Sequence, residues 1–215
     1  MFGLLAHELK TLRRLNTPPK IQDYLDALPI NFEDNGETYM SPRRVLREQT
    51  AHCMEGAMLA ALALRLAGHK PLVMDLKVTD EDDDHVIAVF QRKGLWGAIS
   101  KTNHGTCRYR DPIFRSIREL AMTFFHEYAE PKGKKILRSY SRPVDLSRFD
   151  AKGWMTAEEE VYYVPEYIDA VRHYDVLPGS DVAFLRPADA MERRIGAVLE
   201  WKGAKRLKAL HSEYS

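Results

Sequence analysis

The chain has 215 residues, and its 32 lysines and arginines nearly balance its 31 aspartates and glutamates, for a formal net charge of +1. This balance argues against a strongly basic nucleic-acid binder and against a polybasic membrane-surface protein. Hydrophobic residues make up 45% of the chain, enough for a folded core, and the length suits one domain spanning residues 1–215.

The cysteine content and the first residues indicate a reducing compartment. The two cysteines, Cys53 and Cys107, cannot form a disulfide framework or a cysteine-rich zinc site. The first residues meet His7 and Glu8 at once and lack the basic start and apolar run of a secretory signal. The longest weakly charged stretch, 54–68, is too short for a membrane span. We therefore expect a cytoplasmic protein with neither a membrane nor a nucleic acid as partner.

The first 40 residues predict a helical segment with proline-bearing turns. Helices are expected over Leu4–Leu15 and Ile21–Leu28, each followed by proline. A further helix begins at Pro42, because Ser41 can cap it and proline fits its first position, and it runs towards Arg47.

The segment Cys53–Ala67 is apolar on nearly every face, which is typical of a helix buried on all sides. Gly68 is expected to end this helix. The pattern then changes to period two and predicts strands, the last two joined as a hairpin, over Pro71–Val78, His85–Phe90 and Leu95–Ser100.

Helical spacing predicts further helices in the second half of the chain, over Ile113–Tyr128, from Thr156 to about Tyr174, and over Pro187–Trp201. The basic tail Lys202–Lys208 is expected to be solvated. The predicted fold class is α+β. Its core, about 41–130, packs a buried central helix on an antiparallel sheet, and the helical regions 1–40 and 131–215 pack on that core.

Cys53 stands at the start of the buried helix, just after His52. The partial positive charge of a helix N-terminus stabilises a thiolate, the nucleophilic form of cysteine. His85 opens a predicted strand and can point its ring at the helix end, which would supply the base that a cysteine nucleophile needs. The alternatives are a cysteine that is simply a small buried hydrophobe and a histidine that faces solvent.

These segments resemble the transglutaminase-like cysteine hydrolases, a branch of the papain-like fold. The matching pieces lie within about residues 50–115 and are Cys53–Ala57, Leu66–Val73, His85–Val89, Trp96 and Asp111-Pro112. The resemblance implies that Cys53 is the nucleophile, that His85 is the base, and that Asp111 orients the imidazole.

The third residue of this triad has two candidates. The family places its aspartate a few residues after the strand tryptophan, and here the position four after Trp96 is Ser100. Asp111 lies further on, beyond an insertion, 101–110. Asn103 is the alternative, since papain-like enzymes use an asparagine in this role and the predicted hairpin brings Asn103 close in register to His85. We place Asp111 slightly ahead of Asn103.

Other side chains near Cys53 are candidates for supporting roles. The backbone N–H of Cys53 can help to bind an oxyanion, with Gln49 or His52 as a second donor. Trp96 can shape a substrate cleft or simply pack in the hairpin. Glu55 is rotated by about 200° from Cys53 around the helix, so we expect it to stabilise the helix N-terminus or to hold a neighbouring loop.

The expected function is that of a cysteine hydrolase or acyl transferase, which acts on an amide bond of a peptide or protein and needs no metal or organic cofactor. One alternative is an inactive binding module with the same fold. Another is a metal site formed by Cys53, His85 and a carboxylate of the Asp82–Asp84 loop. The sequence names neither the substrate nor the oligomeric state.

Overall fold

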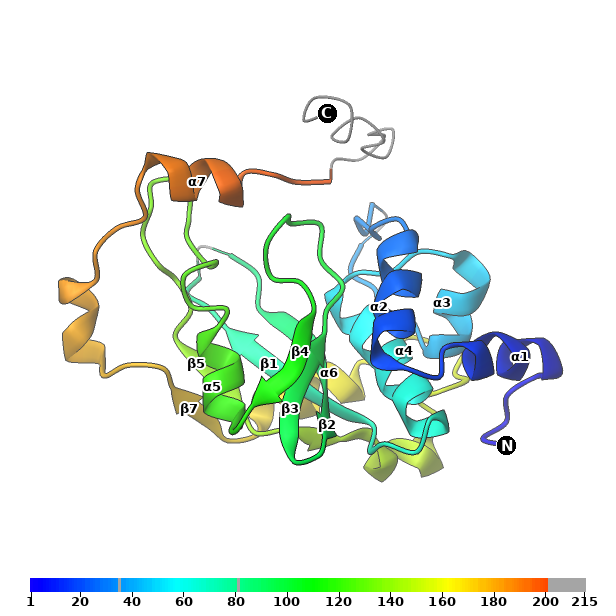
Figure 1. Ribbon diagram of the computed structural model, residues 1–215. Coiled ribbons are helices and arrows are strands. Elements are labelled where there is room, and N and C mark those ends of the chain that lie inside the picture. The colour runs from blue at the N-terminus through cyan, green and yellow to red at the C-terminus, as the bar shows by residue number, and fades with distance from the viewer. Residues whose placement is uncertain (35, 81, 201–215) are drawn as a thin grey trace, which may run out of the picture.

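The structure is a computed structural model that describes residues 1–34, 36–80 and 82–200 (Figure 1). Within these residues the fold is α+β, with one seven-stranded sheet whose neighbouring strands are all antiparallel. In spatial order the strands are β4 (Arg110–Phe114), β3 (Leu95–Ile99), β2 (His85–Arg92), β1 (Leu72–Lys77), β5 (Ser139–Ser141) and β7 (His173–Asp175), and β6 (Val144–Asp145) pairs with β1 as well.

Helices surround this sheet, and the first four gather on one side of it, on the right in Figure 1. These four are α1 (Ala6–Arg14), α2 (Pro18–Ala27), α3 (Pro42–Glu48) and α4 (Cys53–Leu66). The later ones are α5 (Ile117–Met122), the 3-10 helix η1 (Leu146–Lys152), α6 (Tyr163–Ala170), the 3-10 helix η2 (Gly179–Phe184) and α7 (Ala190–Gly196). None of the helices in the described residues is long and apolar enough to cross a membrane.

The central strands bury both of their faces, because successive side chains point to opposite sides of the sheet. Val86 and Ala88 of β2 belong to the hydrophobic cluster that surrounds α4. Ile87 and Val89 belong to a second cluster, which contains Leu120 of α5. The sheet is therefore the middle layer, with a core on each face.

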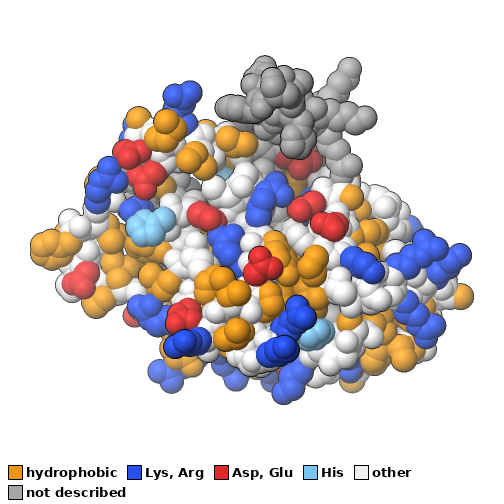
Figure 2. All heavy atoms as spheres, viewed as in Figure 1, with side chains coloured by type: hydrophobic (Ala, Val, Ile, Leu, Met, Phe, Trp, Pro, Cys, Tyr) orange, Lys and Arg blue, Asp and Glu red, His pale blue; other side chains and the backbone are white. Residues whose placement is uncertain are grey.

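On the outside of the molecule, positive and negative side chains are interspersed over the face drawn in Figure 2.

The buried central helix and the hairpin confirm the sequence predictions. Every residue of α4 from Met54 to Leu64 is buried. Gly68 follows the helix with φ +92°, the left-handed conformation that favours glycine. In the hairpin turn, Lys93 and Gly94 both have positive φ, at 51° and 80°, as a two-residue turn with matching twist requires.

The long helix predicted over Ile113–Tyr128 is wrong. The first residues of that segment belong to strand β4, which pairs with β3 through Trp96 and Phe114. Helix α5 begins after Ser116, whose hydroxyl accepts the Glu119 N–H, and it ends after six residues. Tight turns follow it, and they still bury the apolar side chains that produced the helical spacing.

The C-terminal region is less helical than predicted. The helix expected from Thr156 to about Tyr174 is confined to α6, because the residues before it form turns whose hydrogen bonds go to loop 37–41. Strands β5, β6 and β7 extend the sheet within 131–200, where the sequence predicted helices. The helix predicted over Pro187–Trp201 is α7 alone within the described residues. Trp201 and the tail Lys202–Lys208 lie outside them.

Gly56 lets the polypeptide that carries Lys101 lie directly against helix α4. A Cβ atom added at Gly56 would lie 2.5 Å from the Lys101 Cβ and 3.0 Å from its Cγ. Both atoms belong to the base of a side chain that is 2% exposed, so they have little room to move. The absence of a side chain at Gly56 thus allows the segment after β3 to lie close to the start of α4.

We expect Gly56→Ala to destabilise the protein by about 1–3 kcal/mol, because the clash outweighs the better helix propensity of alanine. The free energy of unfolding, measured by urea denaturation, checks this. Gly179→Ala is the matched control, since a Cβ there has no atom within 4 Å and should leave stability nearly unchanged. Equal stability of the two variants would contradict the proposed close approach.

Candidate active site

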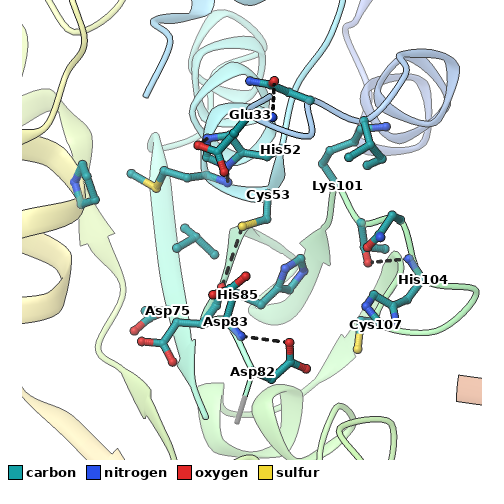
Figure 3. Close-up of a pocket in the computed structure, with 18 of the residues that line it drawn as sticks. Glu33, His52, Cys53, Asp75, Asp82, Asp83, His85, Lys101, His104 and Cys107 are labelled. Carbon is teal, nitrogen blue, oxygen red and sulfur yellow. Dashed lines mark hydrogen bonds and ion pairs between the residues drawn. The ribbon is translucent and has the colours of Figure 1, made fainter. Parts of the chain in front are cut away.

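Cys53 is the first residue of helix α4 and lines a cavity of about 860 Å³ (Figure 3). Its side chain is half-buried, and its Sγ lies 3.9 Å from the backbone oxygen of Asp84. The preceding residue, His52, is the N-cap, so the thiol sits at the positive end of the helix dipole. The expected position of Cys53 at the start of a buried helix is confirmed.

The thiol of Cys53 is acidic for a cysteine. Burial raises the pKa of this thiol. Hydrogen bonds with His52 and His85, together with electrostatic attraction to both imidazoles, lower the pKa by more than burial raises it, and bring it from 9.0 to about 6. At neutral pH the thiolate is therefore the main form of this side chain. The two histidines flank the sulfur from different elements, since His52 caps α4 and His85 begins β2.

His85 is held in place by a serine. Its Nε2 lies 2.8 Å from Ser100 Oγ, and that hydroxyl donates in turn to the carbonyl oxygen of Cys107 at 2.5 Å. Because the serine proton is used in this way, Ser100 accepts from Nε2–H. The neutral ring then carries its proton on Nε2, and the lone pair on Nδ1 is available to the thiol.

Ser100 stands where the sequence analysis expected Asp111 or Asn103. It is fully buried just after β3, and the side chain of Gln22 brackets it by accepting from its N–H at 3.0 Å and donating to its carbonyl at 2.8 Å. Ser100 is the residue four after Trp96, and it lacks the carboxylate that the resemblance implies for the third residue of the triad.

Asp111 and Asn103 lie elsewhere. Asp111 is exposed on β4, the edge strand, and does not line the cavity. Asn103 is half-buried and does line the cavity, in the loop that follows β3. Ser100 accepts the hydrogen bond from His85 Nε2 instead. The pairing of β2 with β3 stops at Ala88 and Ile99, so the chain beyond β3 leaves the register that would bring Asn103 to His85.

The ring of His52 is fixed by hydrogen bonds at both nitrogens. Its Nε2 donates to the Thr38 carbonyl at 2.7 Å, and its Nδ1 accepts the Met54 N–H at 3.3 Å. Burial lowers the pKa of His52, but the hydrogen bond to Cys53 and the negative charges of Cys53 and Glu55 raise it to about 9. When the ring is protonated, the long bond from Met54 gives way to a charge-assisted contact with the thiolate.

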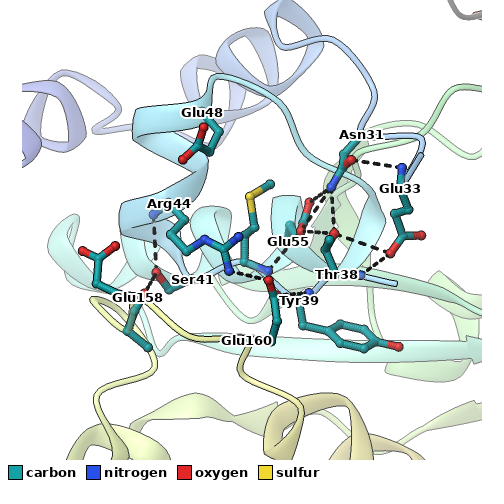
Figure 4. A network of polar contacts seen from close by, with 12 residues as sticks. Asn31, Glu33, Thr38, Tyr39, Ser41, Arg44, Glu48, Glu55, Glu158 and Glu160 are labelled. Carbon is teal, nitrogen blue, oxygen red and sulfur yellow. Dashed lines mark hydrogen bonds and ion pairs between the residues drawn. The ribbon is translucent and has the colours of Figure 1, made fainter. Parts of the chain in front are cut away.

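Glu55 holds a neighbouring loop and the helix start, as the sequence analysis expected (Figure 4). Its carboxylate is fully buried and accepts from the backbone N–H of His52 at 3.0 Å, which completes a capping box. It also accepts from the Met40 N–H at 3.0 Å, the Thr38 hydroxyl at 2.9 Å and the Asn31 amide at 3.1 Å. Asn31, Thr38 and Met40 are thereby held at the N-terminus of α4.

Gln49 and Trp96 lie outside the cavity. Gln49 ends α3 in the left-handed conformation, and its amide donates to the Tyr24 hydroxyl and the Leu46 carbonyl. It therefore cannot donate to an oxyanion at Cys53 in this arrangement. Trp96 is half-buried in the hairpin and packs against the second hydrophobic cluster, which is the packing alternative of the sequence analysis.

The walls of the cavity are formed by residues 82–86, 101–104 and 127–129, by helix α6, and by residues 30–33, 37 and 39. Lys101 is among them, and its ammonium group donates to the Leu28 carbonyl at 2.5 Å. Cys107 also lines the cavity, but burial raises the pKa of its thiol to about 12. The described residues contain no group of three or more His, Cys, Asp and Glu side chains placed to share a metal ion, so the geometry gives no support to the metal-site alternative.

Comparison with known proteins adds no family to this picture. No protein-family model matches the sequence, and no curated protein matches it either. The chemistry of the site is therefore argued from the geometry of Cys53, His85, Ser100 and His52.

Because the pKa of Cys53 is about 6, we expect iodoacetamide to label it at a rate that rises with pH, is half-maximal near pH 6 and is constant above about pH 7.5. His85→Ala and His52→Ala should each move the midpoint to higher pH, since each removes a group that lowers the pKa of the thiol. Labelling rates measured by mass spectrometry check this.

Cys107 is the internal control for this experiment. Its thiol is 5% exposed and has a pKa of about 12, so the folded protein should leave it unlabelled. Equal and slow labelling of both cysteines would contradict an activated thiol at Cys53.

Proposed function

We propose that this protein is a transglutaminase-like thiol hydrolase or acyl transferase that acts on an amide bond of a peptide or protein. The observation that carries the proposal is the pairing of Cys53, at a helix N-terminus, with His85, whose far nitrogen is held by Ser100, beside a large cavity. A nucleophile, a base and a group that orients the base are the parts that such chemistry requires.

In the proposed reaction, the Cys53 thiol gives its proton to Nδ1 of neutral His85, and the resulting thiolate attacks the carbonyl carbon of the amide and forms a C–S bond. The negative charge moves to the carbonyl oxygen, where the backbone N–H of Cys53 at the helix start can stabilise it. The C–N bond then breaks as the His85 imidazolium gives its Nδ1 proton to the leaving amine. The product is a thioester on Cys53.

The thioester is resolved by a second nucleophile. Water, deprotonated by neutral His85, gives a carboxylic acid, and a primary amine gives a new amide, with the thiolate as leaving group in both cases. No metal or organic cofactor takes part in this scheme. Ser100 keeps the His85 ring turned so that Nδ1 faces the sulfur in every step.

The identity of Ser100 also favours a second candidate function, that of an inactive binding module. A serine carries no negative charge, so it stabilises the imidazolium less than an aspartate would. The ion pair of Cys53 and His85 is thereby less well supported than in an enzyme with a carboxylate as the third residue. In the binding module, the cavity holds a peptide and Cys53 performs no chemistry.

We expect Cys53→Ala and His85→Ala to reduce turnover of a peptide mixture about a thousandfold or more, because each removes a group that bonds to the reacting atoms. Release of new amino groups, followed by mass spectrometry, measures hydrolysis, and added primary amine measures transfer. His126→Ala is the matched control, since His126 is exposed and lies outside the cavity. If wild type and Cys53→Ala bind peptides equally and neither turns them over, the binding module is the correct description.

We expect Ser100→Ala to reduce kcat about tenfold with little change in KM, because Ser100 orients His85 and does not touch the substrate. The labelling midpoint of Cys53 should rise in the same variant, since a ring without its Ser100 contact holds its place beside the sulfur less well. Ser116→Ala, which removes an exposed helix cap of α5, is the control for general destabilisation. An unchanged kcat in Ser100→Ala would show that the serine has only a structural role.

A further inference from the structure

The cavity beside Cys53 is strongly acidic, although the whole chain is nearly neutral. Among the described residues that line it, nine are aspartates or glutamates and Lys101 is the one lysine or arginine. The Lys101 ammonium points at the Leu28 carbonyl at 2.5 Å. Three of the acids are paired with a basic side chain outside the cavity, Glu127 with Arg110, Asp169 with Lys77 and Asp75 with His173. The remaining carboxylates leave the cavity with an excess of negative charge.

One of these carboxylates is buried and incompletely satisfied. Asp75 lies in the middle of β1 and is 3% exposed. One of its oxygens, Oδ2, pairs with His173 Nε2 at 3.1 Å, but the other, Oδ1, has no hydrogen-bond partner. A buried carboxylate oxygen without a donor is costly, so a native site with such an atom needs a further partner. Asp75 lines the cavity, so a ligand there can supply that partner (Figure 3).

Further acids line the cavity together with Asp75. Burial, and after it the charges of Asp75 and Asp169, raise the pKa of the Asp84 carboxyl group, whereas the Val78 N–H and the charge of Lys77 lower it. The direction of the shift shows that carboxylates are crowded at Asp84 and that Lys77 offsets them only in part. Glu166 of α6 also lines the cavity and is exposed. These acids come from β1, the loop before β2 and α6, and all of them line this one cavity.

This acidic space adjoins the nucleophile. The backbone oxygen of Asp84 lies 3.9 Å from Cys53 Sγ, and Asp84 directly precedes His85. In the sheet, Asp75 pairs with Val86, the residue after His85. Asp75 and Cys53 line the same cavity, so a ligand bound at Asp75 shares that cavity with the amide bond that Cys53 would attack.

We propose that the substrate carries an alkylammonium or guanidinium group that binds at Asp75 Oδ1, in a cavity that Asp84 and Glu166 also line, while its scissile carbonyl lies at Cys53. This inference rests on the proposed function and specifies the substrate class. A cationic donor satisfies the buried oxygen and offsets the charge of the cavity. Acidic peptides are excluded by the same charges.

Binding is tested with the full-length Cys53→Ala chain, which holds a substrate without turning it over. The probes are two fluorescein-labelled octapeptides that differ only in carrying two lysines or two norleucines. We expect the lysine peptide to bind at least about tenfold more tightly, and Asp75→Asn to remove most of this preference. Glu166→Gln should reduce it severalfold, and Asp23→Asn, an exposed acid of α2 outside the cavity, should leave it unchanged.

The cation that binds at Asp75 can belong to a free amine or to a peptide side chain, and competition by free spermidine distinguishes the two. If it competes at a concentration similar to that of the lysine peptide, the ligand is a free amine, and if it competes only weakly, the ligand is a peptide side chain. Equal binding of the lysine and norleucine peptides would overturn the proposal and leave water as the partner of Asp75. Thermal unfolding of Asp75→Asn checks that the variant folds, and Glu166→Gln, changed at an exposed position, tests the proposal if it does not.

A second measurement uses the wild-type thiol and needs no substrate. Cationic and anionic methanethiosulfonate reagents of similar size modify Cys53, and the ratio of their rates reports the charge of the cavity. We expect the cationic reagent to react at least about tenfold faster, with a smaller ratio in Glu166→Gln and at high salt. A ratio near one overturns the acidic recognition site. Slow reaction with both reagents, at a ratio that still favours the cation, contradicts only the activated thiol of the proposed function.

Discussion

The buried carboxylate of Glu55 is the interaction on which the candidate site depends. It accepts hydrogen bonds from the His52 N–H at the start of α4 and from Thr38 and Met40 in the loop above it. Burial of an ionised carboxylate is tolerable only when several donors surround it, so the loop and the helix start have to stay together. The position of Cys53, one residue after His52, follows from this constraint.

The hydrogen bond between His85 and Ser100 makes the second half of the site. Ser100 is placed by the end of β3 and by two hydrogen bonds with the side chain of Gln22 of α2, so a helix of the first hydrophobic cluster fixes a residue at the end of a strand. Its hydroxyl accepts the hydrogen bond from His85 Nε2–H, so the lone pair of the neutral ring is on Nδ1, and the hydroxyl adds no charge to the site. A buried aspartate in the same place would face the Cys107 carbonyl at the distance of a hydrogen bond, an arrangement in which two acceptors repel.

The sequence predicted the parts of the site that depend on local pattern. The all-round apolar segment predicted α4 and therefore the place of Cys53, and the period-two segment predicted β2 and therefore the place of His85. Ser100 was not predicted, because its role depends on the register between β2 and β3, and serine is common at strand ends. The helix expected over Ile113–Tyr128 was wrong because the apolar residues of a short helix and its following turns reproduce helical spacing. Strands β5 to β7 are two or three residues long, too short to show alternation.

The negative charge of the cavity opposes the ionisation of the Cys53 thiol. Carboxylates near Cys53 disfavour its thiolate, as burial does, whereas the two imidazoles favour it and bring its pKa to about 6. One histidine has to serve as base and so exchanges its proton during the reaction. The other, His52, is held by Thr38 and Glu55 and can keep its positive charge. A histidine at the N-cap, where serine, threonine or aspartate is the usual choice, thus allows a thiolate to exist inside a negatively charged cavity.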